Sequence, residues 1–239
     1  MTLCDAPKKL DPRLACAAQF VRDGAVFADI GTDHAYLPIA LLTAGKIAYA
    51  VAADIAEKPL VSARAHLDAC AKTNPGLYEK TDIVQTDGLW GLENHMPRVT
   101  DIAVCGMGGE LIARIIGDAA FVKNPDIRLI LQPMTMQPHL RRWLAANGFQ
   151  TEYERICRTA NRKLYTVLCC HYTGEIYPCG DADAYFGAAV IKDPENSVLL
   201  PAYLSEKTKR LETIIRGKRE AGLDCSSETA CLEAVGHFL

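Results

Sequence analysis

The chain has 239 residues, enough for one complete α/β domain and a smaller additional region. Its hydrophobic fraction is 49%, its net charge is −3 and its mean hydropathy is near zero, values typical of a soluble globular protein. No stretch approaches the roughly 18 apolar residues of a membrane span, and the N-terminus lacks the apolar core of a signal peptide, so we expect a cytoplasmic protein without membrane contact.

Strand and helix patterns alternate over the first 146 residues, after a short helix expected at residues 12–21. Apolar strands are expected at residues 25–30, 48–54, 82–86, 101–105 and 128–132. Helices are expected between and after them, at residues 37–44, 59–71, 109–116 and 138–146. Continuous apolar strands between helices indicate a parallel sheet covered on both faces.

Two further strands, at residues 151–156 and 164–171, are separated by only a short turn, so they should form an antiparallel pair. A mostly parallel sheet that ends in an antiparallel hairpin is the plan of class I, Rossmann-like methyltransferases. Ordinary dinucleotide-binding Rossmann domains lack that ending. The sequence therefore predicts this α/β fold, with a methyltransferase domain at residues 1–172.

Residues 173–239 form a helical C-terminal region in this interpretation. A boundary loop is indicated by Gly174, Pro178 and Gly180. A long helix should follow at residues 199–221, and a short one at residues 226–238 with Ser226 or Ser227 as its N-cap. Together these two helices predict a helical hairpin.

Basic residues concentrate on the long predicted helix. Six Lys or Arg stand against three Glu between residues 205 and 220, a local charge of +3, so the rest of the chain carries −6. Such a helix can contact the phosphates of a nucleic acid, although an ordinary solvated helix face is the alternative. The candidate contacts are Lys207, Lys209, Arg210, Arg216, Lys218 and Arg219.

Ten cysteines raise the possibility of a disulfide framework or a metal site. Their spacing favours neither, because no Cys-x-x-Cys pair occurs. Cys105, Cys169 and Cys170 lie in apolar segments, where cysteine packs as a small hydrophobic residue. We therefore expect buried, reduced thiols and no metal.

The first strand leads into Asp29-Ile-Gly-Thr-Asp-His-Ala35, at the sheet edge where ligands bind in this fold. Asp33 and Ala35 stand where a dinucleotide-binding loop has glycines. A carboxylate there would repel a pyrophosphate at the helix N-terminus. S-adenosylmethionine has no phosphate and carries a positive sulfonium, so it suits this loop better than NAD. The alternative is that Asp33 only N-caps the following helix.

Further candidate ligand contacts follow the next three strands. Asp54 can accept hydrogen bonds from ribose hydroxyls, and Asp87, with Gly88 beside it, from the amine of an adenine ring. The fourth strand leads into Gly106-Met-Gly-Gly109, a backbone that can pass close to a ligand. The alternatives are a solvated strand end, an Asp-Gly turn and a tight strand-to-helix connection, respectively.

Together these segments resemble the bacterial tRNA N1-methyltransferases that act on adenine at position 22. The resemblance runs from about residue 10 to about residue 168. It is carried by Asp29-Ile-Gly-Thr-Asp-His-Ala-Tyr-Leu-Pro38, Asp87-Gly-Leu89, Gly106-Met-Gly-Gly-x-Leu-Ile112, Leu129-Ile-Leu-Gln-Pro133 and Leu140-Arg-x-Trp-Leu144. Family members usually have Ser in place of Thr32 and Asn in place of Met134, and often Glu in place of Asp54.

The resemblance implies S-adenosylmethionine as the cofactor, tRNA as the partner and Asp33 as the catalytic residue. Adenine N1 would attack the methyl group without prior deprotonation, and the Asp33 carboxylate would stabilise the charge that develops beside the N6 amine. The cofactor-binding residues in this interpretation are Asp29, Gly31, Thr32, His34, Asp54, Asp87, Gly88, Gly106 and Met107. For His34 a purely structural role is the alternative, and Tyr36 could stack on a base or pack internally.

Two other functions stay open at this point. One is a methyltransferase of the same fold that acts on another RNA or a small molecule. The other is an inactive cofactor-binding interaction protein, which the intact Asp33 and the glycine-rich edge argue against. The family also has a C-terminal helical hairpin, matched here in kind but not motif by motif. Its basic residues make the long helix our candidate for tRNA contact, and we favour a monomer.

Overall fold

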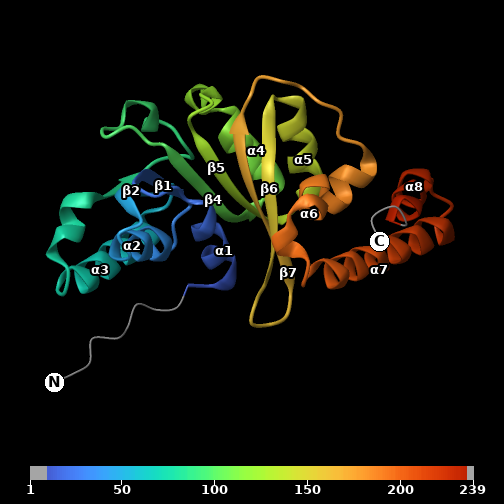
Figure 1. The fold of residues 1–239 in the computed structure, drawn as a ribbon, viewed down its shortest axis with the longest axis horizontal. Helices are drawn as coiled ribbons and strands as arrows, with labels where there is room; N and C mark the ends of the chain where they lie inside the picture. Colours follow the sequence, from blue (N-terminus) through green and yellow to red (C-terminus); the bar gives the residue numbers. More distant parts are fainter. Residues whose placement is uncertain (1–9, 236–239) are drawn as a thin grey trace.

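A computed structural model describes residues 10–235 (Figure 1). Its centre is a seven-stranded sheet with the order β3-β2-β1-β4-β5-β7-β6. Strands β1 to β5 run parallel, and β7 is antiparallel to both β5 and β6. The strands are β1 (Ala25–Ile30), β2 (Ile47–Asp54), β3 (Thr81–Gln85), β4 (Asp101–Gly108), β5 (Arg128–Thr135), β6 (Phe149–Arg158) and β7 (Leu164–Tyr172). The predicted fold class is confirmed.

Helices cover both faces of the sheet. They are α1 (Pro12–Phe20), α2 (Tyr36–Thr43), α3 (Glu57–Ala71), α4 (Gly109–Gly117), α5 (Gln137–Ala146), α6 (Ala188–Lys192), α7 (Leu200–Glu220) and α8 (Ser226–Ala234). Shorter helical turns lie at Pro75–Lys80, Leu92–Asn94, Ala120–Lys123, Asp183–Gly187 and Pro194–Asn196. Ala28 and Ile30 of β1 share a buried cluster with Ile112 of α4, whereas Phe27 shares one with Leu37 of α2. The strand alternation therefore sets which helices cover which face.

Strands β4 and β5 each run three residues past their predicted carboxyl ends. Strands β4 and β5 were expected to end at residues 105 and 132, but they continue to Gly108 and Thr135. The pairing register shifts on either side of Met107, and the Gly106 N–H donates to the Gln132 side chain at 3.1 Å. This side-chain bond holds together a bulged segment that has no apolar pattern.

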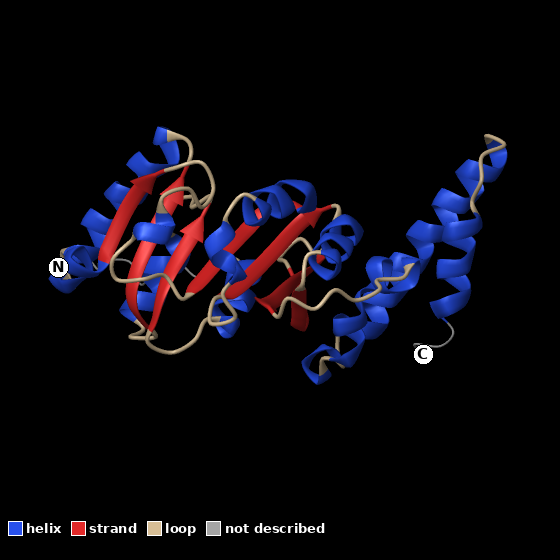
Figure 2. Cartoon of the chain, turned by 90° about the horizontal axis from the view of Figure 1, so that it is seen from above, coloured by secondary structure: helices blue, strands red, loops and turns tan. Residues whose placement is uncertain are grey.

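The predicted helical hairpin is confirmed, but its capping prediction is wrong. Helices α7 and α8 pack side by side and project from the β6 end of the sheet (Figure 2), with Lys218 and Glu228 paired at 2.7 Å. Cys225 occupies the N-cap of α8 without a side-chain bond. The Asp224 carboxylate accepts from the Ser226 N–H at 3.0 Å instead. The last part of the predicted helix, residues 236–238, lies outside the described residues.

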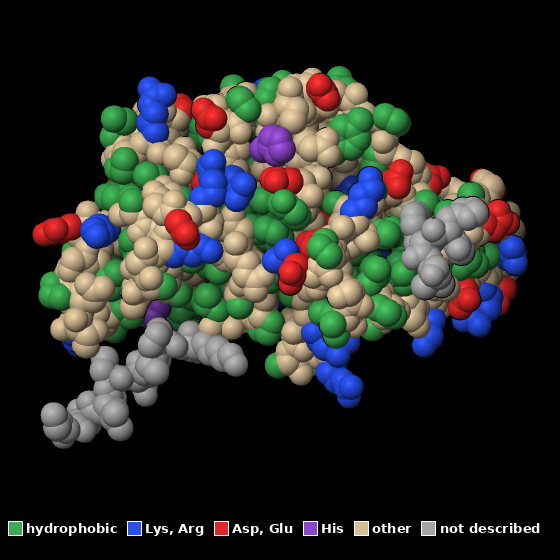
Figure 3. Space-filling view, viewed as in Figure 1, with side chains coloured by type: hydrophobic (Ala, Val, Ile, Leu, Met, Phe, Trp, Pro, Cys, Tyr) green, Lys and Arg blue, Asp and Glu red, His purple; other side chains and the backbone are tan. Residues whose placement is uncertain are grey.

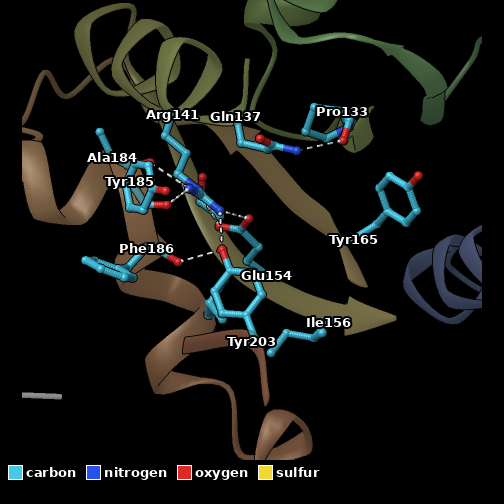
Figure 4. Close-up of polar contacts among 12 residues, drawn as sticks. Pro133, Gln137, Arg141, Glu154, Ile156, Tyr165, Ala184, Tyr185, Phe186 and Tyr203 are labelled. Atoms are coloured by element: carbon cyan, nitrogen blue, oxygen red, sulfur yellow. Dashed lines mark hydrogen bonds and ion pairs between the residues drawn. The ribbon is translucent and has the colours of Figure 1, made fainter. Parts of the chain in front are cut away.

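A buried ion pair attaches this C-terminal region to the sheet (Figure 4). Arg141 of α5 and Glu154 of β6 form two hydrogen bonds of 2.6 and 3.0 Å, and their side chains are 6% and 1% exposed. The remaining guanidinium hydrogens go to the carbonyls of Ala184 and Tyr185 and to the Tyr203 hydroxyl of α7. The sequence suggested only a boundary loop around residues 183–187. This segment in fact provides the backbone carbonyls that the buried Arg141 requires.

Strand β6 is also an edge strand, whose free backbone needs partners. Asn196, which is 1% exposed, accepts from the Ile156 N–H at 2.7 Å and donates to the Glu154 carbonyl at 2.7 Å. Tyr203 and Leu204 of α7 join Ile156 in a third apolar cluster. The C-terminal region therefore covers the end of the sheet.

Removing one partner of the buried pair should be costly. We expect Glu154→Ala to lower the free energy of unfolding by about 3–5 kcal/mol, because it leaves the Arg141 guanidinium buried without an opposite charge. The double variant Arg141→Met/Glu154→Leu should recover most of that loss. Urea unfolding followed by circular dichroism measures both. A loss below about 1 kcal/mol for Glu154→Ala, typical of an exposed pair, would contradict the burial described here.

Candidate active site

The loop after β1 is fixed to its neighbours by short bonds. The Gly31 and Thr32 N–H groups both donate to the Ala53 carbonyl of β2, at 2.8 and 2.9 Å. The Thr32 hydroxyl is buried and donates to the Asp29 carboxylate at 2.7 Å. Burial raises the pKa of Asp29 to about 6, and the nearby Asp54 adds to that rise, while the bond from Thr32 opposes it. Thr32 therefore positions Asp29, which a serine could also do.

Two consecutive left-handed residues turn the chain from this loop into α2. His34 and Ala35 have φ values of +62° and +51°, a conformation that is uncommon for residues other than glycine and that collects at functional sites. Ala35 is the N-cap of α2, and no side chain bonds to that helix end. Asp33 is therefore not a helix cap, and its carboxylate is 80% exposed at the sheet edge.

The side chains beside Asp33 form a small aromatic group. The His34 Nε2 lies 3.3 Å from an Asp33 carboxylate oxygen, and the His34 ring stacks on Tyr36 with centroids 5.1 Å apart. His66 of α3 contacts the Tyr36 ring edge-on at 4.8 Å, and its Nδ1 lies 2.8 Å from the His34 carbonyl. Tyr36 is thus packed between two imidazoles, and His34 is oriented toward the carboxylate.

Several predicted cofactor residues gather around one cavity of about 100 Å³. Gly31, Asp54, Asp87, Gly88 and Met107 all line it. A larger cavity of about 540 Å³ adjoins it and shares Asp87 and Gly88. Together the two reach the ~300–1,000 Å³ typical of small-molecule sites.

The partners of the two strand-end aspartates are local. The Asp54 carboxylate accepts from the Ala56 N–H at 2.7 Å, and Asp87 lies 3.6 Å from the Arg114 guanidinium of α4. Both side chains keep further acceptor positions. The Met107 side chain lies across Gly31, so that a Cβ at Gly31 would stand 2.0 Å from the Met107 methyl carbon. Methionine has three rotatable side-chain bonds, so this cover can move.

Residues near β5 contribute to the edge in a way that the sequence did not reveal. The Gln132 side-chain Oε1 accepts from the Gly106 N–H, and the Gln132 Nε2 lies 3.7 Å from the Met134 sulfur. Arg13 of α1 also donates to that sulfur, at 2.8 Å. Met134 stands where the resemblance leads us to expect Asn, and the Gln137 amide lies at the same edge, 3.5 Å from the Met134 carbonyl. The sequence motifs that contain these residues carry the family resemblance, but they do not indicate these bonds.

The six predicted tRNA contacts on α7 are in different environments. Lys209, Arg210, Arg216 and Arg219 are exposed. Lys218 is paired with Glu228, which offsets its charge, and Lys207 lies partly buried over the rings of Tyr185 and Tyr203, at 5.0 and 5.5 Å. Lys and Arg side chains gather along the lower edge of the molecule, in the region of the β6–β7 hairpin and α7 (Figure 3).

Comparison with known proteins decides the family. Residues 10–168 match the methyltransferase domain family. The tRNA (adenine(22)-N(1))-methyltransferase of Bacillus subtilis is 33% identical over 178 residues, which cover 74% of this chain and 68% of that protein. The chain belongs to the tRNA (adenine(22)-N(1))-methyltransferase family. The resemblance seen in the sequence is thereby confirmed.

Solved structures of this methyltransferase family agree in fold over about 95% of the chain. The B. subtilis m1A22 tRNA methyltransferase TrmK superposes with a TM-score of 0.75 at 28% identity, covering 96% of this chain and 95% of that one. A Streptococcus pneumoniae protein crystallised with S-adenosyl-L-methionine gives 0.77 at 32% identity, covering 95% and 98%. The C-terminal helices are therefore included in the similarity.

Residues 10–235 of this methyltransferase show neither a metal-binding cluster nor a membrane-spanning helix. No three or more His, Cys, Asp or Glu side chains are grouped there so as to hold a metal ion. None of the helices in that range has the length and apolar character needed to cross a membrane.

Gly31→Ala in this methyltransferase should weaken S-adenosylmethionine binding by about tenfold or more, since an added methyl group displaces Met107 and narrows the cavity. Gly24→Ala is the matched control: φ is +74° at Gly24 and +73° at Gly31, but nothing lies within 4 Å of the added carbon at Gly24. Both variants should lose about 1–2 kcal/mol of stability from the left-handed backbone. Calorimetry should show weaker cofactor binding for Gly31→Ala alone, and equal affinities would contradict this reading.

Proposed function

We propose that this chain transfers a methyl group from S-adenosylmethionine to N1 of adenine 22 in tRNA. The observation that carries this proposal is the Asp33 carboxylate, which is exposed in the loop after β1, two residues beyond Gly31 of the cavity lining and just before two left-handed residues. Family membership supports the same reaction, because the Bacillus subtilis relative is named for it. Incubating the protein with labelled cofactor and tRNA transcripts, followed by mass spectrometry of the nucleosides, tests it directly.

The residues at the sheet edge suit S-adenosylmethionine. When bound, this cofactor supplies an electrophilic methyl group on a positively charged sulfur. Asp29 would accept a hydrogen bond from an ammonium group, Asp54 from ribose hydroxyls and Asp87 from an adenine amine. Gly31 lets the backbone approach the ligand closely, and Asp33 would repel a phosphate at that place.

Asp33 has the chemistry that N1 methylation needs. The adenine N1 lone pair is free once the base is unpaired, so no base has to activate it. Methylation places positive charge on the ring and makes the N6 amine more acidic. An exposed carboxylate within reach can stabilise that charge and accept a proton. The imidazole of His34, 3.3 Å from Asp33, orients the carboxylate.

The C-terminal region, residues 173–239, is the proposed tRNA-docking part beside the methyltransferase domain, residues 1–172. The exposed cations Lys209, Arg210, Arg216 and Arg219 of α7 would contact phosphates. In this proposal the chain acts as a monomer in the cytoplasm.

Asp33→Asn should lower the rate of methyl transfer about 10²–10⁴-fold while leaving cofactor affinity nearly unchanged. Asp23→Asn is a matched control, because Asp23 is exposed in the turn before β1, at the other end of that strand. Single-turnover kinetics and calorimetry measure the two effects. Near-normal turnover of Asp33→Asn would exclude a catalytic role for this carboxylate.

Cofactor binding should depend on the protonation of Asp29. A bound ammonium group favours the ionised carboxylate, so the pKa of Asp29 in the complex lies below its value of about 6 in the free protein. Affinity should therefore be full above that pH and fall by up to about tenfold per unit as the pH drops below it. Titrations from about pH 7.5 to about pH 5 measure this, and Asp29→Asn should remove the dependence. A wild-type profile as flat as that of the variant would contradict it.

A further inference from the structure

A second hollow, of about 290 Å³, lies between the β5–α5 connection, the start of β7 and helix α7. We call it the hairpin–helix cleft. Six of the residues that line it are Met134, Gln137, Lys163, Thr166, Lys207 and Arg210. Figure 4 shows the Gln137 and Tyr165 side of this region, with Tyr203 of α7 below.

The cleft adjoins the edge where methyl transfer takes place. Met134 lines it from the end of β5, and Gln137 from the start of α5. Gln132, whose amide nitrogen lies 3.7 Å from the Met134 sulfur, also accepts from the backbone of Gly106 on β4. A chain of direct contacts therefore leads from the glycine-rich edge to the wall of the cleft.

Three cations converge on this cleft without a matching anion. Lys163 reaches it from the β6–β7 connection, and Lys207 and Arg210 from α7. Among the described residues no carboxylate lies within 4.0 Å of any of these three charges. Glu206 is the one acidic residue at the rim. Three positive charges around one small hollow repel one another unless an anion lies between them.

Polar groups with unused hydrogen-bonding capacity lie beside these charges. The Thr166 hydroxyl is buried and has no hydrogen-bond partner within residues 10–235, and Thr166 as a whole is 2% exposed. The Gln137 amide makes only long bonds, of 3.4 and 3.5 Å, to the carbonyls of Pro133 and Met134. A buried hydroxyl without a partner is unfavourable, so its presence here is consistent with a polar ligand.

Lys207 is held in place at this cleft. Its ammonium lies over the rings of Tyr185 and Tyr203, and the Tyr203 hydroxyl is fixed by bonds to Arg141 and to the Phe186 carbonyl. Burial, and then the charge of Arg141, lower the pKa of Lys207 to about 7. An entering anion would favour its protonated form.

We propose that the hairpin–helix cleft binds a phosphodiester of the tRNA backbone close to the adenine that is methylated, through Lys163, Lys207 and Arg210. A polyanion fits better than a small free anion, because exposed Arg158 and Arg162 on the hairpin continue the positive surface away from the cleft. This contact deepens the proposed function and rests on it.

Charge-removing variants test the cleft. Lys163→Gln and Arg210→Gln should each raise the Kd for a tRNA transcript about tenfold, as expected for the loss of a charge-assisted hydrogen bond. The slope of log Kd against log salt should fall by about one for each. Lys123→Gln removes the same charge from an exposed site outside the cleft and should change Kd less than about twofold.

The possible outcomes distinguish a failure of the cleft proposal from a failure of the proposed function. A wild-type protein that neither binds nor methylates tRNA overturns both. Suppose that the wild type methylates tRNA. The cleft proposal alone is then overturned if the cleft variants bind tRNA normally, or if Lys123→Gln loses as much affinity as they do. Thermal unfolding of each variant shows whether any loss reflects misfolding.

The pH dependence of binding gives a readout that depends on Lys207. The charged or titratable groups that face it are Arg141 of α5, Glu154 of β6, Tyr185 before α6, and Tyr203, Glu206 and Arg210 of α7. Since the phosphodiester raises the Lys207 pKa above about 7, binding takes up a proton and affinity falls as the pH rises from about 7 to about 9.

Two substitutions isolate that effect. Lys207→Met keeps the side-chain stem and should bind more weakly at pH 7, without the extra pH slope. Lys207→Arg keeps a charge at every pH used, so it should bind at pH 9 more tightly than wild type and also lack the slope. The same slope in wild type and both variants would overturn the assignment of Lys207, and Lys207→Arg gives this answer even if Lys207→Met is unstable.

Discussion

The buried pair of Arg141 and Glu154 determines how the two parts of this molecule meet. An arginine enclosed by protein needs an opposite charge and an acceptor for nearly every N–H group. The acceptors come from β6, from the carbonyls of residues 184 and 185 and from Tyr203 of α7. Because these bonds fix α7 against the sheet, they also place Lys207 and Arg210 beside the end of β5. The proposed RNA contact thus depends on an ion pair that has no part in the proposed chemistry.

A second constraint comes from the parallel sheet, which places the carboxyl ends of β1 to β4 at one edge. Carboxylates at that edge repel one another, and the protein separates their roles by environment. Asp29 is buried against Thr32, with a raised pKa, whereas Asp33 is exposed beside His34. The left-handed residues His34 and Ala35 make the difference, since they turn the chain into α2 without using Asp33 as a cap.

The sequence predicted what depends on local pattern. Each of the seven strands was placed to within three residues, because buried strands are continuous apolar runs, and the aspartates at their ends followed from sheet topology. It did not predict the extension of β4, which rests on a bond between Gly106 and a side chain 26 residues away. It likewise missed the turn at Asp183–Gly187, which forms where a buried arginine needs carbonyls.

The basic helix shows why charge counted along a sequence is not the charge available for binding. Six cations were predicted to contact RNA. The charge of Lys218 is offset by Glu228, and the pKa of Lys207 is lowered by burial and by the charge of Arg141. Lys163, outside that helix, joins the same surface because β7 begins beside α7. The sequence suggested a basic tail on an acidic body. In the structure, the relevant cations instead line one cleft and come from two distant segments of the chain. In the proposed function, that arrangement would follow the path of an RNA backbone, which a single charged helix face cannot define, and would couple tRNA docking to the position of the base at the β4 edge.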